Sequence, residues 1–133
     1  MLPMRIGSMK LSRWIAAMAL LAASRPGLAH HSAAAEYWAQ VKTWTGTITR
    51  FSWMNPHTWV YFDMTDPGGK VRHMECEGSS PSGLIRNGWT RATLAPGNRV
   101  TIEGYPAKDR TDGCKVKDVI LPGGRRMVMV EDQ

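Results

Sequence analysis

Length, composition and charge limit the kinds of protein that this chain can be. It has 133 residues, 43% of them apolar, with 17 Lys and Arg against 11 Asp and Glu. A formal net charge of +6 is typical of proteins that bind nucleic acids or anionic membranes when the basic residues gather on one surface. Four of them lie before residue 26, however, and the other 13 are nearly balanced by the 11 acidic residues. The length therefore allows one domain, and nucleic-acid binding is disfavoured because residues 30–133 carry no basic stripe.

The first 29 residues have the pattern of an export signal. A basic start ends at Arg13, an apolar run follows at residues 14–23, and small residues lead to Ala29. A transmembrane anchor is the alternative, but Arg13 and Arg25 bracket only eleven uncharged residues, fewer than the roughly 18 that a spanning helix needs. We therefore expect a signal peptide at residues 1–29, cleavage after Ala29, and a periplasmic or secreted protein with no transmembrane anchor after processing.

After an N-terminal segment at residues 30–42, the pattern becomes that of a small all-β domain at residues 43–133. Short apolar or β-branched runs alternate with clusters of Gly, Pro, Asn and Asp. Ser80 and Pro81 predict the start of a short helix that ends by Gly88. The predicted strands are residues 43–53, 58–64, 70–77, 100–103, 114–121 and 125–130.

Three strands, a short helix and two further strands follow the order of the OB-fold barrel. We therefore predict a small OB-fold-like barrel of five or six strands with one short helix between the third and fourth strands. A barrel suits a chain of this size, because closing the sheet removes edges that would otherwise pair with other chains. The alternative is another small β-barrel or an open sandwich.

Cys76 and Cys114 are the only cysteines of the expected exported domain. An oxidising compartment favours a disulfide between them. In an OB barrel the third and fifth strands are parallel neighbours, but Cys76 ends one and Cys114 begins the other, so we expect the two residues at opposite ends of the barrel. A disulfide and two semi-buried thiols therefore both remain open.

Cleavage after Ala29 would make His30 the first residue of the mature chain. Its α-amine and imidazole can then chelate one metal ion, since their ordinary pKa values lie near 8 and 6.5. Nitrogen ligands of this kind suit Cu(II). We predict a further ligand from His57, which lies on the loop after the first strand, with His31 and His73 as the alternatives. The Met54 thioether on the same loop suits Cu(I). The alternative is a solvated terminus that binds nothing.

Aromatic residues predict a second kind of binding surface. Trp53, Trp59 and Tyr61 lie close to the same loop, and OB-folds use such rings to bind ligands. We therefore expect these residues to form a face for a small ligand or a protein partner, with packing in the core as the alternative. Hydrolase chemistry has little support, because the sequence contains no GxSxG motif.

Several short motifs extend over most of the expected mature chain. They are His30-His31-Ser32 with Glu36, Gly46-Thr47-Ile48, Trp53-Met54-Asn55-Pro56-His57, Gly88-Trp89-Thr90, Pro96-Gly97, Val100 to Gly104, and Ala107-Lys108-Asp109. Together they resemble a family of small secreted Gram-negative bacterial proteins classed as a domain of unknown function. The resemblance implies export and a small β-barrel, and it implies no activity or ligand. Cys76 and Cys114 do not belong to its pattern.

The sequence thus favours a periplasmic, non-catalytic binding module that holds copper through His30, His57 and His31. A metal-free adaptor that uses its aromatic face for a small ligand or a periplasmic protein is the alternative. An oxidoreductase that uses the same copper site is a weaker third interpretation.

Overall fold

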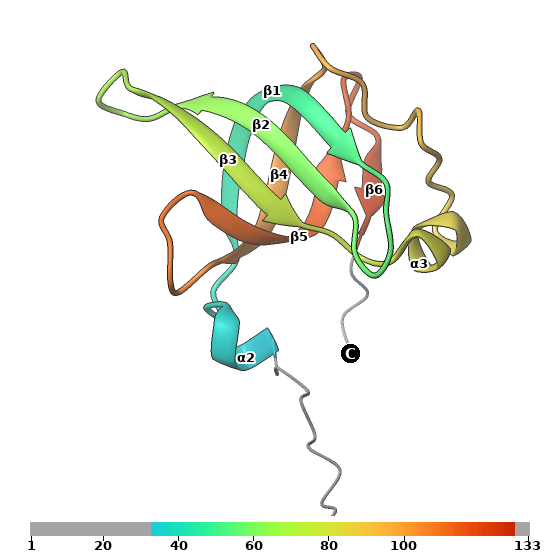
Figure 1. Cartoon of the computed structure of the whole chain (residues 1–133). Coiled ribbons are helices and arrows are strands. Elements are labelled where there is room, and N and C mark those ends of the chain that lie inside the picture. Colours follow the sequence, from blue (N-terminus) through green and yellow to red (C-terminus); the bar gives the residue numbers. More distant parts are fainter. Residues whose placement is uncertain (1–32, 130–133) are drawn as a thin grey trace, which may run out of the picture. The chain divides into compact units, whose positions relative to one another are not determined.

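The computed structural model describes residues 33–129 (Figure 1). The predicted signal peptide, His30 and His31 lie outside these residues. The elements are α2 (Ala33–Glu36), β1 (Lys42–Ser52), β2 (Trp59–Thr65), β3 (Val71–Glu77), α3 (Pro81–Arg86), β4 (Arg99–Pro106), β5 (Gly113–Ile120) and β6 (Arg126–Val128).

Five strands close into a barrel, which confirms the predicted fold class. β1 pairs with β2 and β4, β2 with β3, and β4 with β5, all antiparallel. A parallel pairing of β3 with β5 completes the ring, and β6 adds to β5 outside it. The short helix α3 lies between β3 and β4 in the chain, as predicted. This strand order is that of the OB-fold.

The alternation of the sequence decides which side chains fill the barrel. In β2, Val60 and Phe62 are fully buried, whereas Trp59 and Tyr61 between them are only half-buried. In β3, Met74 and Cys76 are buried in the same way. Successive side chains of a strand point to opposite faces, so these residues form the core.

Gly46 allows β1 to bend from its first partner to its second. β1 pairs with β4 up to Thr47 and with β2 from Thr47 onwards. A Cβ atom at Gly46 would lie 2.5 Å from the Asp63 carbonyl oxygen and 2.7 Å from the Phe62 ring. The two strands therefore come so close together at this point that no side chain fits between them.

The helix α3 begins as the sequence predicts. The Ser80 side chain accepts a hydrogen bond from the Gly83 amide, and Pro81 occupies the first turn. Leu84 is buried in the core cluster. Trp89 follows the helix, is buried, and donates from Nε1 to the Val128 carbonyl at 2.7 Å.

Cys76 and Cys114 form a disulfide, with their Cα atoms 4.4 Å apart. The expected parallel pairing of their strands is confirmed, but the expectation that they lie at opposite ends of the barrel is wrong. β3 and β5 pair only where β3 ends and β5 begins, and Cys76 is directly opposite Cys114 in that register. Closing a barrel requires neighbouring strands to be staggered, so the end of one meets the start of the next.

Within residues 33–129 no helix is long and apolar enough to cross a membrane.

Candidate functional site

A polar cluster of three side chains lies where β3 ends, and it consists of Tyr37, Glu77 and His57. The Tyr37 hydroxyl donates to Glu77 Oε2 at 2.5 Å, and His57 Nδ1 pairs with the other carboxylate oxygen, Oε1. The Glu77 side chain is only 13% exposed, whereas that of His57 is 50% exposed. Glu77 thus links the segment after α2 to the loop between β1 and β2.

Strand alternation turns Glu77 away from the core. Cys76 before it is fully buried and disulfide-bonded, so the next side chain of β3 points to the outer face. His57 precedes β2, whose first residue, Trp59, is paired with Glu77 in the β2–β3 ladder. The ladder therefore brings the loop histidine and the carboxylate together.

Backbone hydrogen bonds fasten the segment around α2 to the same end of the barrel. Tyr37 forms an isolated β-bridge with Ala107, and the Trp38 amide donates to the Pro106 carbonyl at 2.9 Å. The Lys108 amide donates to the Glu36 carbonyl, and its ammonium donates to the Ala34 carbonyl at 2.6 Å. Figure 1 shows α2 beside the loop between β4 and β5. The segment is therefore held in place on the barrel.

Burial and the neighbouring carboxylate act on the Tyr37 phenol in the same direction. Removal of the hydroxyl from water raises the pKa of Tyr37 well above its ordinary value, and the hydrogen bond to Glu77 and the charge of that carboxylate raise it further. The phenol is therefore a proton donor throughout the neutral pH range.

Of the predicted metal ligands, the structure describes His57 and Met54. His57 pairs through Nδ1, which leaves Nε2 of a half-exposed ring for another partner. Met54 is 55% exposed on the same loop, next to the cis peptide bond between Asn55 and Pro56. Among residues 33–129 there is no group of three or more His, Cys, Asp and Glu side chains that could hold a metal ion.

The predicted aromatic face is divided between two environments. Trp53 packs edge-on against Phe51, at a centroid distance of 5.7 Å, and both rings lie against the core. Trp59 and Tyr61 belong to the outer face of β2. The Arg50 guanidinium lies 3.9 Å from the Tyr61 ring centre, so one face of this ring is already in a cation–π contact.

A hollow of about 490 Å³ adjoins the polar cluster, and we call it the α2 pocket. Its walls are residues 35–37 of the α2 segment, Trp59, Glu77, and residues 107–110 of the loop between β4 and β5. Tyr37 and Glu77 of the polar cluster therefore line the pocket, together with Trp59 of the predicted aromatic face.

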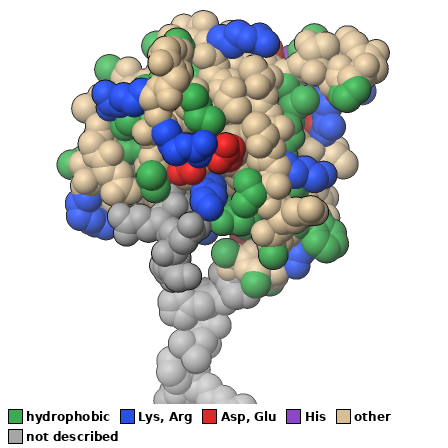
Figure 2. All heavy atoms as spheres, turned by 180° about the vertical axis from the view of Figure 1, so that it is seen from behind, with side chains coloured by type: hydrophobic (Ala, Val, Ile, Leu, Met, Phe, Trp, Pro, Cys, Tyr) green, Lys and Arg blue, Asp and Glu red, His purple; other side chains and the backbone are tan. Residues whose placement is uncertain are grey.

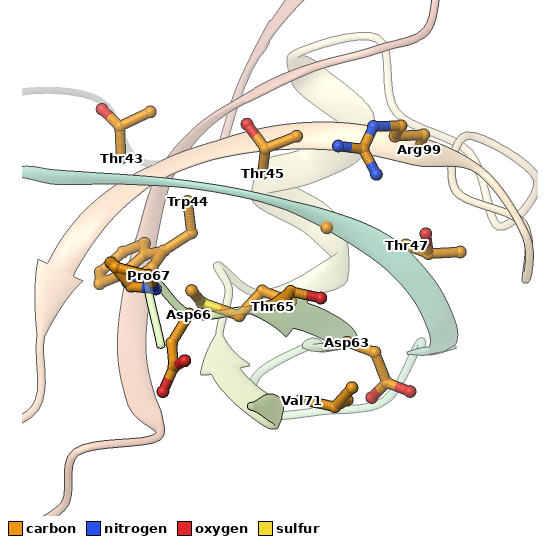
Figure 3. Close-up of a pocket in the computed structure, with 12 residues that line it drawn as sticks. Thr43, Trp44, Thr45, Thr47, Asp63, Thr65, Asp66, Pro67, Val71 and Arg99 are labelled. Atoms are coloured by element: carbon orange, nitrogen blue, oxygen red, sulfur yellow. The ribbon is translucent and has the colours of Figure 1, made fainter. Parts of the chain in front are cut away.

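A second hollow, of about 720 Å³, lies between the first half of β1 and the β2–β3 hairpin. Figure 3 shows the Trp44 side chain directed towards Pro67, and Thr43 and Thr45 directed away from the hairpin. The two carboxylates of this hollow already have partners within the protein, because Asp63 pairs with His73 and Asp66 accepts a hydrogen bond from the Lys70 amide. Of the described residues that were predicted to bind a ligand or a metal, none lines this hollow.

The part of the surface that residues 33–129 form shows no continuous basic area when it is seen from behind. In Figure 2 the lysines and arginines of this face are separated by other atoms, and some lie directly against carboxylates. Among the described residues, Arg126 pairs with Glu103 at 2.7 Å and with Asp118 at 2.8 Å. This arrangement agrees with the balanced charge of residues 30–133.

Comparison with known proteins identifies the family. A family of unknown function, DUF6152, matches residues 17–115, well over half of the chain. The chain belongs to this family. No curated protein matches the chain significantly.

Tyr37 and Glu77 are the site residues that the sequence did not single out. The outward direction of Glu77 follows from the alternation of β3, but its partner on the α2 segment is 40 residues away in the chain. No local pattern connects the two, because the link depends on how the N-terminal segment folds back over the barrel.

Proposed function

We propose that this DUF6152 protein is an exported periplasmic binding module that holds a copper ion. The proposed ligands are the amine and imidazole of His30 at a processed N-terminus, the His57 imidazole, and His31. In this proposal Met54 supplies a soft thioether when the ion is Cu(I).

The pairing of His57 with Glu77 is the observation that carries the proposal. Histidines that bind metals usually direct their other ring nitrogen to a carboxylate or carbonyl, which fixes the tautomer and the orientation of the ring. His57 has this arrangement, because Nδ1 meets a carboxylate that Tyr37 also holds, while Nε2 is left for a ligand. An imidazole fixed in this way loses less conformational freedom on binding than a free one.

The fastened α2 segment is a second support. Residues 33–38 are bonded to the same end of the barrel as the His57–Glu77 pair, through the Tyr37 hydroxyl and the Trp38 and Lys108 hydrogen bonds. His31 and His30 precede Ala33 in the sequence by two and three residues. The donor set is rich in nitrogen, which suits Cu(II) better than Mg²⁺ or Ca²⁺.

Titration of Cu(II) into variants of the protein tests this site. We expect His57→Ala to lower the affinity at least tenfold, and Glu77→Gln to lower it about tenfold because the ring loses its orienting carboxylate. His73→Ala is the matched control, since His73 also pairs with an aspartate, Asp63, but on another part of the sheet. Full affinity in His57→Ala would rule out His57 as a ligand.

Export has its own test. The intact mass of the protein recovered from the periplasm of a Gram-negative host should correspond to a chain that starts at His30. A mass that starts at Met1 would exclude a histidine N-terminus and with it the chelate.

A metal-free adaptor is the second proposal, favoured by the position of Trp59 in the wall of the α2 pocket. A small ligand or protein partner at this end would change the fluorescence of Trp59 without added metal. The contribution of Trp59 is the difference between the fluorescence spectra of the wild type and the Trp59→Phe variant. If addition of periplasmic extract leaves this difference unchanged, the adaptor proposal is contradicted.

A further inference from the structure

We propose that the α2 pocket binds a free aromatic α-amino acid in its zwitterionic form. This inference does not depend on the copper proposal, because neither His57 nor Met54 lines the pocket.

The size and the walls of the pocket fit such a ligand. Its volume of about 490 Å³ lies in the range of small-molecule sites. Two rings, Tyr37 and Trp59, and the methyl groups of Ala35 and Ala107 supply apolar wall surface. A flat apolar side chain can stack on these rings.

Arg110 is the group in the wall that is best suited to a carboxylate. Its side chain is 41% exposed, and its guanidinium is only loosely engaged, 3.6 Å from Glu75 and 5.8 Å from the centre of the Trp59 ring. A guanidinium offers two parallel N–H groups that match the two oxygens of a carboxylate. The carboxylate of a ligand stacked on Trp59 would therefore find a partner in Arg110.

Asp109 is the complementary group for an ammonium. It is exposed, and it makes no hydrogen bond or ion pair with any residue that the structure describes. The other charges in the wall are already engaged. Glu77 is bonded through both oxygens, the Lys108 ammonium donates to Ala34, and Glu36 also has a partner. An unpaired anion and a loosely paired cation in the same wall favour a ligand that carries both charges over one that carries a single charge.

Calorimetric titration of L-phenylalanine into the metal-free protein, with a chelator present, tests the proposal. The chelator is needed because α-amino acids bind copper themselves. We expect saturable binding of phenylalanine, at least fivefold tighter than binding of phenylacetate, which lacks the ammonium, or phenethylamine, which lacks the carboxylate. No binding of phenylalanine up to about 10 mM, a concentration that would detect even a weak site, would overturn the proposal. Equal binding of all three compounds would overturn it as well.

Variants locate the contacts. Arg110→Gln should weaken phenylalanine at least tenfold, because a charged hydrogen bond is lost, and should weaken phenethylamine little. Asp109→Asn should weaken phenylalanine up to about fivefold, as expected for an exposed charge pair. Arg86→Gln is the control, since Arg86 is an exposed arginine of α3 that does not line the pocket. Unchanged affinity in Arg110→Gln would exclude this site.

The two proposals fail separately. His57→Ala should lose copper and keep phenylalanine binding, whereas Trp59→Leu should lose phenylalanine and keep copper. If His57→Ala removes phenylalanine binding as well, the α2 pocket is not an independent site.

Discussion

The disulfide lies in the shortest strand pairing of the barrel, that of β3 with β5, which we call a seam of the ring. Its removal gives the strongest prediction for stability. β3 and β5 are joined by three residue pairs, Glu75 with Gly113, Cys76 with Cys114, and Glu77 with Lys115. Every other seam of the ring has at least five pairs. We therefore expect the double variant Cys76→Ala/Cys114→Ala to be less stable and to open first at this seam.

The magnitude follows from the length of the loop that the bond closes. The cysteines are separated by 38 residues, and for a loop of this length the loss of chain entropy in the unfolded state corresponds to about 4 kcal/mol at 25 °C. A domain of this size has a total stability of about 5–15 kcal/mol. The double variant should therefore lose a large part of its stability.

Equilibrium unfolding in urea measures this loss. The wild type reduced while unfolded and refolded in reductant is the control, because it keeps both buried sulfur atoms and lacks only the cross-link. We expect the control and the double variant to lose similar stability, and amide hydrogen exchange to rise first at residues 113–115. A loss below about 1 kcal/mol, less than the lower end of typical disulfide contributions, would refute the view that the bond holds the seam.

Two further predictions concern single residues. Gly46→Ala should cost about 1–3 kcal/mol, because the new Cβ would meet the Asp63 carbonyl; Gly83→Ala in α3, where the nearest atom is 3.4 Å away, should be neutral or slightly stabilising in the same unfolding assay. The raised pKa of Tyr37 contributes stability that is complete below about pH 10 and is lost as the pH rises further, so unfolding of the wild type between pH 8 and 11 should show a steeper alkaline decline than unfolding of Tyr37→Phe. Equal slopes would contradict the burial of the phenol against Glu77.

The strands could be predicted from the sequence because they depend on local alternation. Val60 and Phe62 face the core and Trp59 and Tyr61 the outside, as the period of two requires. The short helix was also predictable, since a capping serine and a proline mark its start at Ser80. These features need no knowledge of distant parts of the chain.

Contacts between distant segments were less predictable. The register that aligns Cys76 with Cys114 depends on the stagger of the whole barrel, which no short segment encodes. The contact of Tyr37 with Glu77 depends in turn on the anchoring of the α2 segment to the β4–β5 loop. His57 was proposed as a ligand from its place on the loop, whereas its carboxylate partner Glu77 was not predictable.

The copper proposal depends most directly on the amine of His30. Cu(II) should therefore be titrated into protein that begins at His30 and into the same protein with one alanine added before it. The proposal predicts at least a tenfold loss of affinity in the extended form, because the amine and imidazole of His30 can no longer chelate the ion together as the first residue. Equal affinity of the two forms, or no binding of either below micromolar concentration, would contradict it.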